Sequence, residues 1–283
     1  MAKLDVYETV TNQIISELEE GALPWVKEWT CGGGMPVNAV TGRQYSGINT
    51  LILWIMAEQK SFSSNKWCTF NQAKTKKSSV IKGEKSTAVI FYKQLEKEST
   101  NDKGDIEYIS IPMLKRFNVF NVDQIDGIED GKTNENIEAL PEIELFIQSL
   151  DVKMVIGSPA FIPKMDWLHM PKIDSFSSVD GYYATLFHEL IHWSGAKKRL
   201  DRDMQGRFGD ESYAMEELIA EIGAAFLCAE FGFKSEVRHA GYIESWLKVL
   251  KNDKKAIFAA AAKASQAVEY IKSIAVGKIH STD

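Results

Sequence analysis

The sequence predicts an α+β protein with two domains, and three observations lead to this prediction. Residues 183–193 place two histidines and a glutamate in an apolar helical pattern, residues 86–122 alternate as strands do, and the sign of the charge reverses between these regions. We place the first domain at residues 1–122, an acidic linker at 123–140 and the second domain at 141–283. A chain of 283 residues is long enough to give each domain its own core.

Composition narrows the class of protein. No long uncharged apolar run is present, and the N-terminus carries acids without the apolar stretch of a signal peptide, so we expect a cytoplasmic protein without a membrane span. Three widely separated cysteines without a CxxC pair argue against a disulfide framework and against a cysteine zinc finger. The net charge of −6 argues against a uniformly basic nucleic-acid binder, so the distribution of charge matters more than its sum.

The first domain is predicted to begin with helices and to end with strands. Apolar residues recur at steps of four over residues 4–20, which indicates an amphipathic helix. A second helix is expected to begin near Asn49, and a third, shorter one to cover residues 67–77. From Ser86 to Val122 the alternation of apolar and polar residues predicts strands.

The segment Lys60–Lys93 is basic, with eight lysines and a single acid, Glu84. Aromatic residues are interleaved with these lysines: Phe62, Trp67, Phe70, Phe91 and Tyr92. Lysines that follow phosphates beside rings that stack on bases suit single-stranded DNA without sequence preference. The alternative is that the rings are core and the lysines a solvated face, and composition favours neither. Trp54 and Phe91 are the strongest core candidates, because they lie in apolar runs.

The charge then reverses, because Asp123–Glu144 holds eight acids and only Lys132 opposes them. This pattern is typical of an exposed linker, and the alternative is an acidic strip that keeps DNA off the second domain. A helix from Pro141 to about Leu150 is expected next. Strands are expected in two later segments, 152–162 and 167–173.

The motif HELIH at residues 188–192 predicts a metal site. Positions i and i+4 lie on one face of a helix, so His188 and His192 can direct their imidazoles at one divalent ion, usually zinc. Glu189 lies at the edge of that face, where a carboxylate can take a proton from a water molecule that the metal activates. A buried helix without metal is disfavoured, because Glu189 would then be an unpaired buried charge.

A catalytic zinc site needs a third protein ligand. The extended metzincin pattern would place it as a histidine at position 198, but the chain has Lys198 there, so that class is excluded. A glutamate from the helical stretch 212–227 is the alternative, and small residues there permit close approach of the two helices. We assign Glu217 as the ligand and Glu221 as the acceptor of a ring N–H from one ligating histidine. Glu216, about a hundred degrees round the helix, is expected on a solvated face.

Two further features bear on the site. The polar segment 197–211 suits either a mobile flap over a cleft or an ordinary surface loop. A developing oxyanion needs a donor from outside the motif, and His239 is a candidate for that role, with a surface or capping histidine as the alternative. The order of the predicted elements, with strands first and the HExxH helix after them, predicts a zincin-type α+β domain.

Over nearly its whole length the chain resembles the ArdC family of plasmid antirestriction proteins, whose N-terminal domain is shared with TraC-type DNA primases. Long stretches carry the resemblance: Pro24-Trp25, residues 38–49, 67–73, 82–93 and 117–124, and the two helical segments around 182–202 and 213–227. It implies an N-terminal domain that binds single-stranded DNA and a C-terminal zincin-like metallopeptidase domain. The ligands implied are His188, His192 and Glu217, with Glu189 as catalytic acid and base.

The resemblance also favours DNA binding over a merely solvated basic face. We expect these residues to contact the strand: Trp25, Arg43, Tyr45, Asn49, Trp67, Phe70, Lys74, Lys82, Lys85 and Lys93. Proteins of this kind protect incoming conjugative DNA from host restriction enzymes. The alternatives are a non-catalytic protein with a structural metal, which occupies DNA or the restriction enzyme, and a primase-associated accessory factor. Zinc is the expected ion, with manganese as the alternative, and a peptide substrate cannot be identified from these residues.

Overall fold

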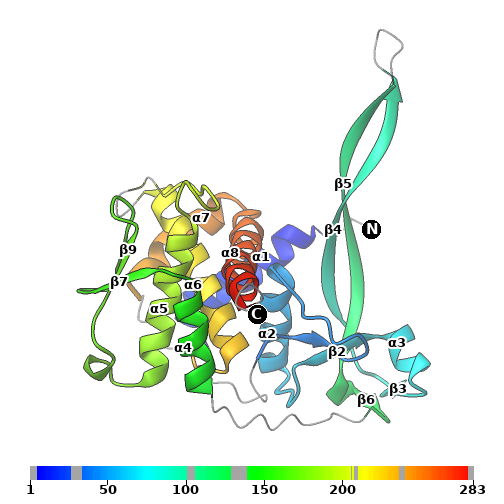
Figure 1. The fold of residues 1–283 in the computed structure, drawn as a ribbon. Helices are drawn as coiled ribbons and strands as arrows, with labels where there is room; N and C mark the ends of the chain where they lie inside the picture. The colour runs from blue at the N-terminus through cyan, green and yellow to red at the C-terminus, as the bar shows by residue number, and fades with distance from the viewer. Residues whose placement is uncertain are drawn as a thin grey trace.

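The computed structural model describes residues 5–26, 34–100, 106–128, 139–204, 206, 210–235 and 240–279. Figure 1 shows a body of packed helices beside a smaller part that contains a sheet, from which a long β-hairpin projects. The predicted α+β class is confirmed by this arrangement.

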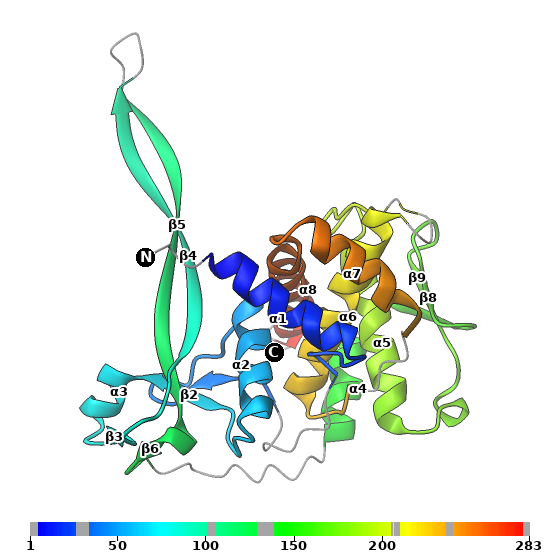
Figure 2. The same ribbon diagram turned by 180° about the vertical axis from the view of Figure 1, so that it is seen from behind.

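The first two predicted helices are confirmed. Helix α1 covers Val6–Glu19, and the carboxylate of Asp5 caps it by accepting a hydrogen bond of 3.0 Å from the backbone N–H of Tyr7. Helix α2 covers Ile48–Gln59. Figure 2 shows α1 next to α7 (Ile243–Asn252), which belongs to the other end of the chain.

The predicted third helix is only partly correct. Residues Lys66–Thr69 form strand β2, and helix α3 begins at Phe70 and ends at Thr75. Thr69 and Gln72 form a reciprocal capping box, which fixes where the strand stops and the helix starts. The predicted helix therefore began three residues too early, before this capping signal.

The main sheet has the strand order β1-β2-β5-β4, and only the β1–β2 pair is parallel. Strands β4 (Thr87–Thr100) and β5 (Ile106–Asn121) form the long hairpin, in register with Phe91 opposite Lys115. Residues 101–105, which connect the two strands, lie outside the described residues. The remaining short elements here are β1 (Val37–Asn38), β3 (Ser79–Val80), η1 (Val122–Gln124) and β6 (Ile125–Asp126).

The predicted linker begins inside this part of the fold. Residues 122–126 form η1 and β6, and β6 pairs with β3 in a two-stranded sheet. Residues 129–138 lie outside the described residues. Helix α4 (Ala139–Ser149) follows, as the sequence predicted.

The C-terminal half contains a three-stranded sheet and a helical body. The predicted strands are confirmed as β7 (Lys153–Ile156), β8 (Ala160–Ile162) and β9 (Trp167–Met170), in the order β7-β9-β8. Beyond the turn η2 (Ile173–Ser175), helices α5 (Val179–Ser194) and α6 (Glu211–Phe231) pack against each other. The turn η3 (Ala240–Tyr242), α7 and α8 (Ala256–Ile279) complete the body. Of the helices in the described ranges, none combines the length and apolar character needed to span a bilayer.

One hydrophobic core joins the start of the chain to the C-terminal helices. Trp25 packs edge-on against Trp246 of α7, with ring centroids 5.7 Å apart. Trp54 of α2 contacts Phe226 of α6 in the same way, at 5.6 Å. The helices that hold the metal site are therefore supported from both ends of the sequence.

Burial of the aromatic residues differs from two of the expectations. Trp67 is fully buried in a small core against α2, whereas Phe70 is 56% exposed. Trp54 is core as predicted, but Phe91, the other expected core residue, is 46% exposed. An apolar run alone therefore did not indicate burial of Phe91.

The difference in burial between Trp67 and Phe70 can be tested with a matched pair of substitutions. Trp67→Ala is expected to lower the free energy of unfolding by about 3–5 kcal/mol, because it removes a buried ring. Phe70→Ala is expected to change it by no more than about 0.5 kcal/mol, because that ring is largely in solvent. Urea unfolding of both variants measures this, and equal losses of stability would contradict the assignment of core and surface.

Candidate metal centre

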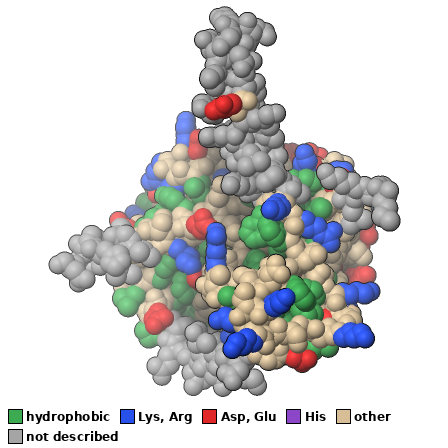
Figure 3. Space-filling model, turned by 90° about the vertical axis from the view of Figure 1, so that its right-hand side faces the viewer, with side chains coloured by type: hydrophobic (Ala, Val, Ile, Leu, Met, Phe, Trp, Pro, Cys, Tyr) green, Lys and Arg blue, Asp and Glu red, His purple; other side chains and the backbone are tan. Residues whose placement is uncertain are grey.

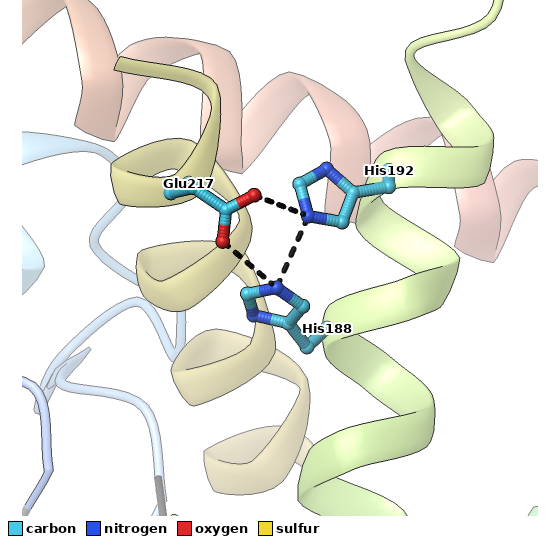
Figure 4. Close-up of side chains that lie close together, drawn as sticks. All are labelled: His188, His192 and Glu217. Atoms are coloured by element: carbon cyan, nitrogen blue, oxygen red, sulfur yellow. Dashed lines mark hydrogen bonds and ion pairs between the residues drawn. The ribbon is translucent and has the colours of Figure 1, made fainter. Parts of the chain in front are cut away.

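Helix α5 places the two histidines of the motif on one face. Ser178 begins the helix by accepting a hydrogen bond of 2.9 Å from the backbone N–H of Gly181. One turn apart, His188 and His192 then direct their Nε2 atoms at each other, 3.0 Å apart (Figure 4). Both side chains are buried.

Glu217 of α6 completes the group. Its two carboxylate oxygens lie 3.5 Å from Nε2 of His188 and 3.4 Å from Nε2 of His192. Close approach of α5 and α6 makes this contact possible, because Gly223 leaves room where a Cβ would lie 2.7 Å from the Ile191 side chain. The small residues predicted to permit that approach are buried.

These three side chains fit a divalent cation. One ligand atom from each lies within 4.8 Å of the other two, the only such group found among the described residues. Two nitrogens bound about 2.0 Å from a tetrahedral ion are about 3.3 Å apart, close to the separations observed here. Three protein donors leave a coordination position for water or substrate, as catalytic sites do.

Two further carboxylates contact the Nδ1 atoms of the histidine rings, on the side away from the proposed metal position. Glu221, predicted as an outer acceptor, has its Oε1 3.3 Å from Nδ1 of His188. Glu216 has its Oε1 3.2 Å from Nδ1 of His192. An N–H at Nδ1 leaves the Nε2 lone pair free for a metal, so these acceptors set the tautomer that binding requires.

The expectation that Glu216 lies on a solvated face was wrong, because its side chain is buried. Arg202 accounts for this, since its guanidinium donates to both carboxylate oxygens of Glu216, at 2.9 and 2.7 Å. Arg202 comes from the segment 197–211, which was expected to be a flap or a surface loop. Its side chain is buried and also donates to the carbonyl of Ile191 at 2.6 Å, so this part of the segment belongs to the site.

The electrostatics of the site favour a cation. Burial lowers the pKa of His188, but hydrogen bonds to Glu217 and Glu221 outweigh it and raise the pKa to about 10. Burial likewise opposes charge on His192, and Glu216 and Glu217 raise its pKa. Burial would raise the pKa of Glu216, but Arg202 and His192 hold it below its ordinary value. The site therefore attracts positive charge, which a metal ion supplies when it replaces the ring protons.

The metal centre opens into a cleft of about 830 Å³. Glu189 lines it, and the backbone N–H of Phe161 donates a hydrogen bond of 2.7 Å to its carboxylate. This hydrogen bond fixes the Glu189 carboxylate in the cleft that His188, His192 and Glu217 also line. Nothing in the sequence pointed to Phe161, because the partner is a backbone group of strand β8.

Two tyrosines line the same cleft, and the sequence pattern did not single them out for a role. The hydroxyls of Tyr213 and Tyr242 lie 3.1 Å apart. Burial, then the contact with Tyr242 and the charge of Glu217, raise the pKa of Tyr213, so its hydroxyl keeps its proton. His239, the predicted oxyanion donor, lies outside the described residues.

The expected DNA contacts fall into two groups. Four are buried: Trp25, Tyr45, Asn49 and Trp67. Trp25 and Trp67 have no exposed ring face for a base, and the Asn49 side chain bonds the N–H and C=O of Ile90, at 2.7 Å each. Those three side chains build the fold, which corrects the expectation that they touch the strand.

The exposed group is Arg43, Phe70, Lys74, Lys82 and Lys85. Figure 3 shows one face of the molecule, over which Lys and Arg side chains are spread with hydrophobic side chains between them. The side chain of Lys93 lies outside the described residues. Five of the residues expected to contact DNA are therefore exposed enough to do so.

Comparison with known proteins finds relatives for both the N-terminal and the C-terminal half of the chain. A family model described as the N-terminal domain of anti-restriction factor ArdC matches residues 4–120, and one described as a zincin-like metallopeptidase matches residues 141–263. The metal-free crystal structure of the antirestriction ArdC protein from the R388 plasmid superposes with a TM-score of 0.84 and 39% identity, covering 97% of this chain and 99% of that one. Its Mn(II)-bound structure gives a TM-score of 0.80 at 39% identity, covering 96% and 98%.

Two curated relatives are also similar over most of this chain. The uncharacterized protein y4eC of Sinorhizobium fredii (strain NBRC 101917 / NGR234) is 37% identical over 94% of this chain and 91% of its own length. DNA primase TraC of Escherichia coli is 34% identical over 95% of this chain, which spans only 27% of that primase.

The fold and the group His188, His192 and Glu217 define a protein in which an ArdC-type N-terminal domain is followed by a zincin-like domain with a candidate metal site. The chain belongs to the ArdC family of antirestriction proteins. The predicted resemblance is confirmed.

The carboxylate behind His192 gives a prediction about metal affinity. Glu216→Gln is expected to weaken binding of a divalent ion about 10–100-fold, because it removes the charge that orients the His192 ring and pairs with Arg202. Isothermal titration of the chelated protein measures the affinity. Glu211→Gln, an exposed change on the same helix, is the control and should leave the affinity unchanged.

The raised pKa of His188 predicts how stability depends on pH after chelation. The folded pKa of about 10 lies above the unfolded value of 6.5, so the protonated ring stabilises the fold fully below pH 6.5. That contribution is lost as the pH rises towards 10. The Tm of metal-free protein should therefore fall over this range, and less so in His188→Asn. A Tm that rises with pH in metal-free protein would contradict this.

Proposed function

We propose that this chain is a divalent-metal-dependent peptidase that also binds single-stranded DNA and protects incoming plasmid DNA from host restriction. One observation carries the enzymatic part: His188, His192 and Glu217 converge beside Glu189 at the wall of a large cleft. Zinc is the proposed ion, and manganese is supported by the Mn(II)-bound structure of the R388 relative.

In the proposed mechanism Glu189 is the proton carrier. His188, His192 and Glu217 would hold a divalent cation, which would polarise the scissile carbonyl and lower the pKa of water. Glu189 takes a proton from the attacking water and returns it to the leaving amine. The N–H of Phe161 keeps its carboxylate in place for both transfers.

Other groups in the cleft serve the substrate. Strand β8 lies at the edge of its sheet and lines the cleft, so an extended peptide can pair with it. The hydroxyls of Tyr213 and Tyr242 are candidate donors to the oxyanion that forms at the scissile carbon. The contrasting function, a binding protein with a structural metal, is less favoured because a structural site has four protein ligands.

DNA binding is supported by different observations. Phe70 is exposed on α3, and the exposed lysines Lys74 and Lys82 belong to the same part of the fold. An exposed ring beside cations suits a single strand. The relation to TraC supports the same partner, although this chain spans too little of that primase to carry over primase activity.

Three measurements test the proposed function. Elemental analysis of purified protein should find about one divalent ion per chain. Hydrolysis of an unstructured protein such as casein should require that ion, and fluorescence anisotropy should detect binding of single-stranded oligonucleotides. A plasmid-transfer assay into a restricting host then tests protection. Protein that retains no metal and hydrolyses nothing would refute the peptidase part.

A further inference from the structure

A second cleft, separate from the metal centre, lies where the two halves of the chain meet. Its volume is about 850 Å³. One wall comes from the loop 41–49 and strand β4, and the other from α8 and the start of α1. Both views of the ribbon show the first turns of α1 close to the β4–β5 hairpin (Figures 1 and 2).

A hydrogen bond joins the two walls. The backbone N–H of Gly47 donates a hydrogen bond of 2.8 Å to the hydroxyl of Ser265 on α8. Gly47 has a φ of +60°, and a Cβ there would lie 3.9 Å from the backbone of Ala261 and Ala262. The loop therefore approaches α8 closely, and these contacts fix the position of one wall of the cleft relative to the other.

Aromatic rings stand on both walls. Phe91 on β4 is 46% exposed and meets Phe117 edge-on at 5.1 Å, which holds the ring in one orientation. Tyr7 and Phe258 form a second edge-on pair at 4.6 Å on the other wall. Rings that are fixed in this way are suitable platforms for nucleobases.

Cations stand beside these rings. Arg43 and Lys255 line the cleft and are exposed, and Lys255 places its ammonium 5.6 Å from the centroid of the Tyr7 ring. Glu269 is the only acid among the lining residues. Between these groups, Ala259 and Ala262 of α8 leave space for a ligand, so cations and rings are available to the same molecule.

We infer that this cleft binds a short stretch of single-stranded DNA, with a base stacked on Phe91 and phosphates paired with Arg43 and Lys255. The inference rests on the proposed DNA binding and deepens it. It assigns DNA contacts to α8, in the C-terminal half of the chain, whereas the basic segment Lys60–Lys93 lies wholly in the N-terminal half. The strand thus contacts both halves at their junction.

A pair of lysines on one helix tests this inference. Lys255 and Lys263 are both exposed on or beside α8, but only Lys255 lines the cleft. At about 0.1 M salt, Lys255→Ala should weaken binding of a fluorescein-labelled oligo(dT) about fivefold, the expected effect of one lost phosphate contact. Lys263→Ala should bind as the unmodified protein does.

A blocking variant tests the same site without removing a cation. Ala262→Glu should weaken oligo(dT) binding at least about tenfold, because it puts bulk and negative charge where the strand lies. Ala262 is exposed, so the Tm and metal content should not change, and both are measured. If the unmodified protein binds oligo(dT) but Lys255→Ala and Ala262→Glu bind equally well, the inference fails and the proposed function stands. If the unmodified protein binds no oligo(dT), the inference and the proposed DNA binding both fail, and the peptidase part is judged by its own measurements.

Discussion

Glu189→Gln is expected to abolish peptide hydrolysis while the protein keeps its metal. The loss should be about 10²–10⁴-fold in kcat, because a glutamine cannot take the proton that the mechanism transfers. Glu189 is not among the three donors that converge on the ion, so metal content should not change. A glutamine oxygen can still accept the hydrogen bond from the N–H of Phe161, so the side chain should also keep its position.

The same variant separates catalysis from protection. Glu142→Gln, an exposed change on α4, is the control and should leave hydrolysis intact. If Glu189→Gln loses hydrolysis and also loses protection in plasmid transfer, proteolysis is the protective act. If protection persists without hydrolysis, the protein protects by binding. Undiminished hydrolysis in the variant would contradict the assignment of Glu189 as the proton carrier.

The inner part of the metal site could be predicted from sequence because helical geometry is regular. A spacing of four residues fixes where His188 and His192 point, whatever the rest of the fold does. Glu217 could be assigned because the stretch of small residues around it indicated a helix packed closely on another. Glu221 follows Glu217 by one turn, so its place behind the His188 ring was open to the same reasoning.

The surrounding groups could not be predicted, because they depend on tertiary contacts. Nothing in the pattern of the segment 197–211 shows that Arg202 turns inward to pair with Glu216, and without that partner an adjacent glutamate looks solvated. The N–H of Phe161 is a backbone group, and no residue type signals its use. The prediction of the third helix missed strand β2, although Thr69 and Gln72 form a capping box that marks the start of the helix inside that segment.

Aromatic residues in a basic segment show the same limit for DNA binding. Composition treats Trp67 and Phe70 alike, but one lies under α2 and the other in solvent. Family motifs do not resolve this, because a long similar stretch preserves core residues as well as contact residues. Only exposure separates the two, and it moves the expected stacking from the tryptophans to Phe70 and Phe91.

Binding of single-stranded DNA is expected to weaken at least about 100-fold between 50 and 200 mM salt. Five of the phosphate contacts, in addition to those of Arg43 and Lys255, come from exposed lysines of the basic segment: Lys74, Lys76, Lys77, Lys82 and Lys85. Five contacts give a slope of about −3.5 in log K against log[salt], because each phosphate neutralised on a single strand contributes about −0.7. Fluorescence anisotropy at four salt concentrations measures the slope. Binding should not depend on base sequence, because neither lysines nor a stacking ring reads base edges.

Single substitutions then divide this slope among residues. Lys82→Ala should make it shallower by about 0.7, and the equally exposed Lys248→Ala on α7 should not change it. Phe70→Ala should weaken binding about 5-fold to 150-fold at every salt concentration without changing the slope, because stacking releases no counterions. Duplex DNA offers phosphates but no free base faces, so it should show the salt dependence without the effect of Phe70→Ala. Equal affinity for duplex and single strand would therefore mean that charge alone drives binding, and that neither Phe70 nor Phe91 stacks on a base.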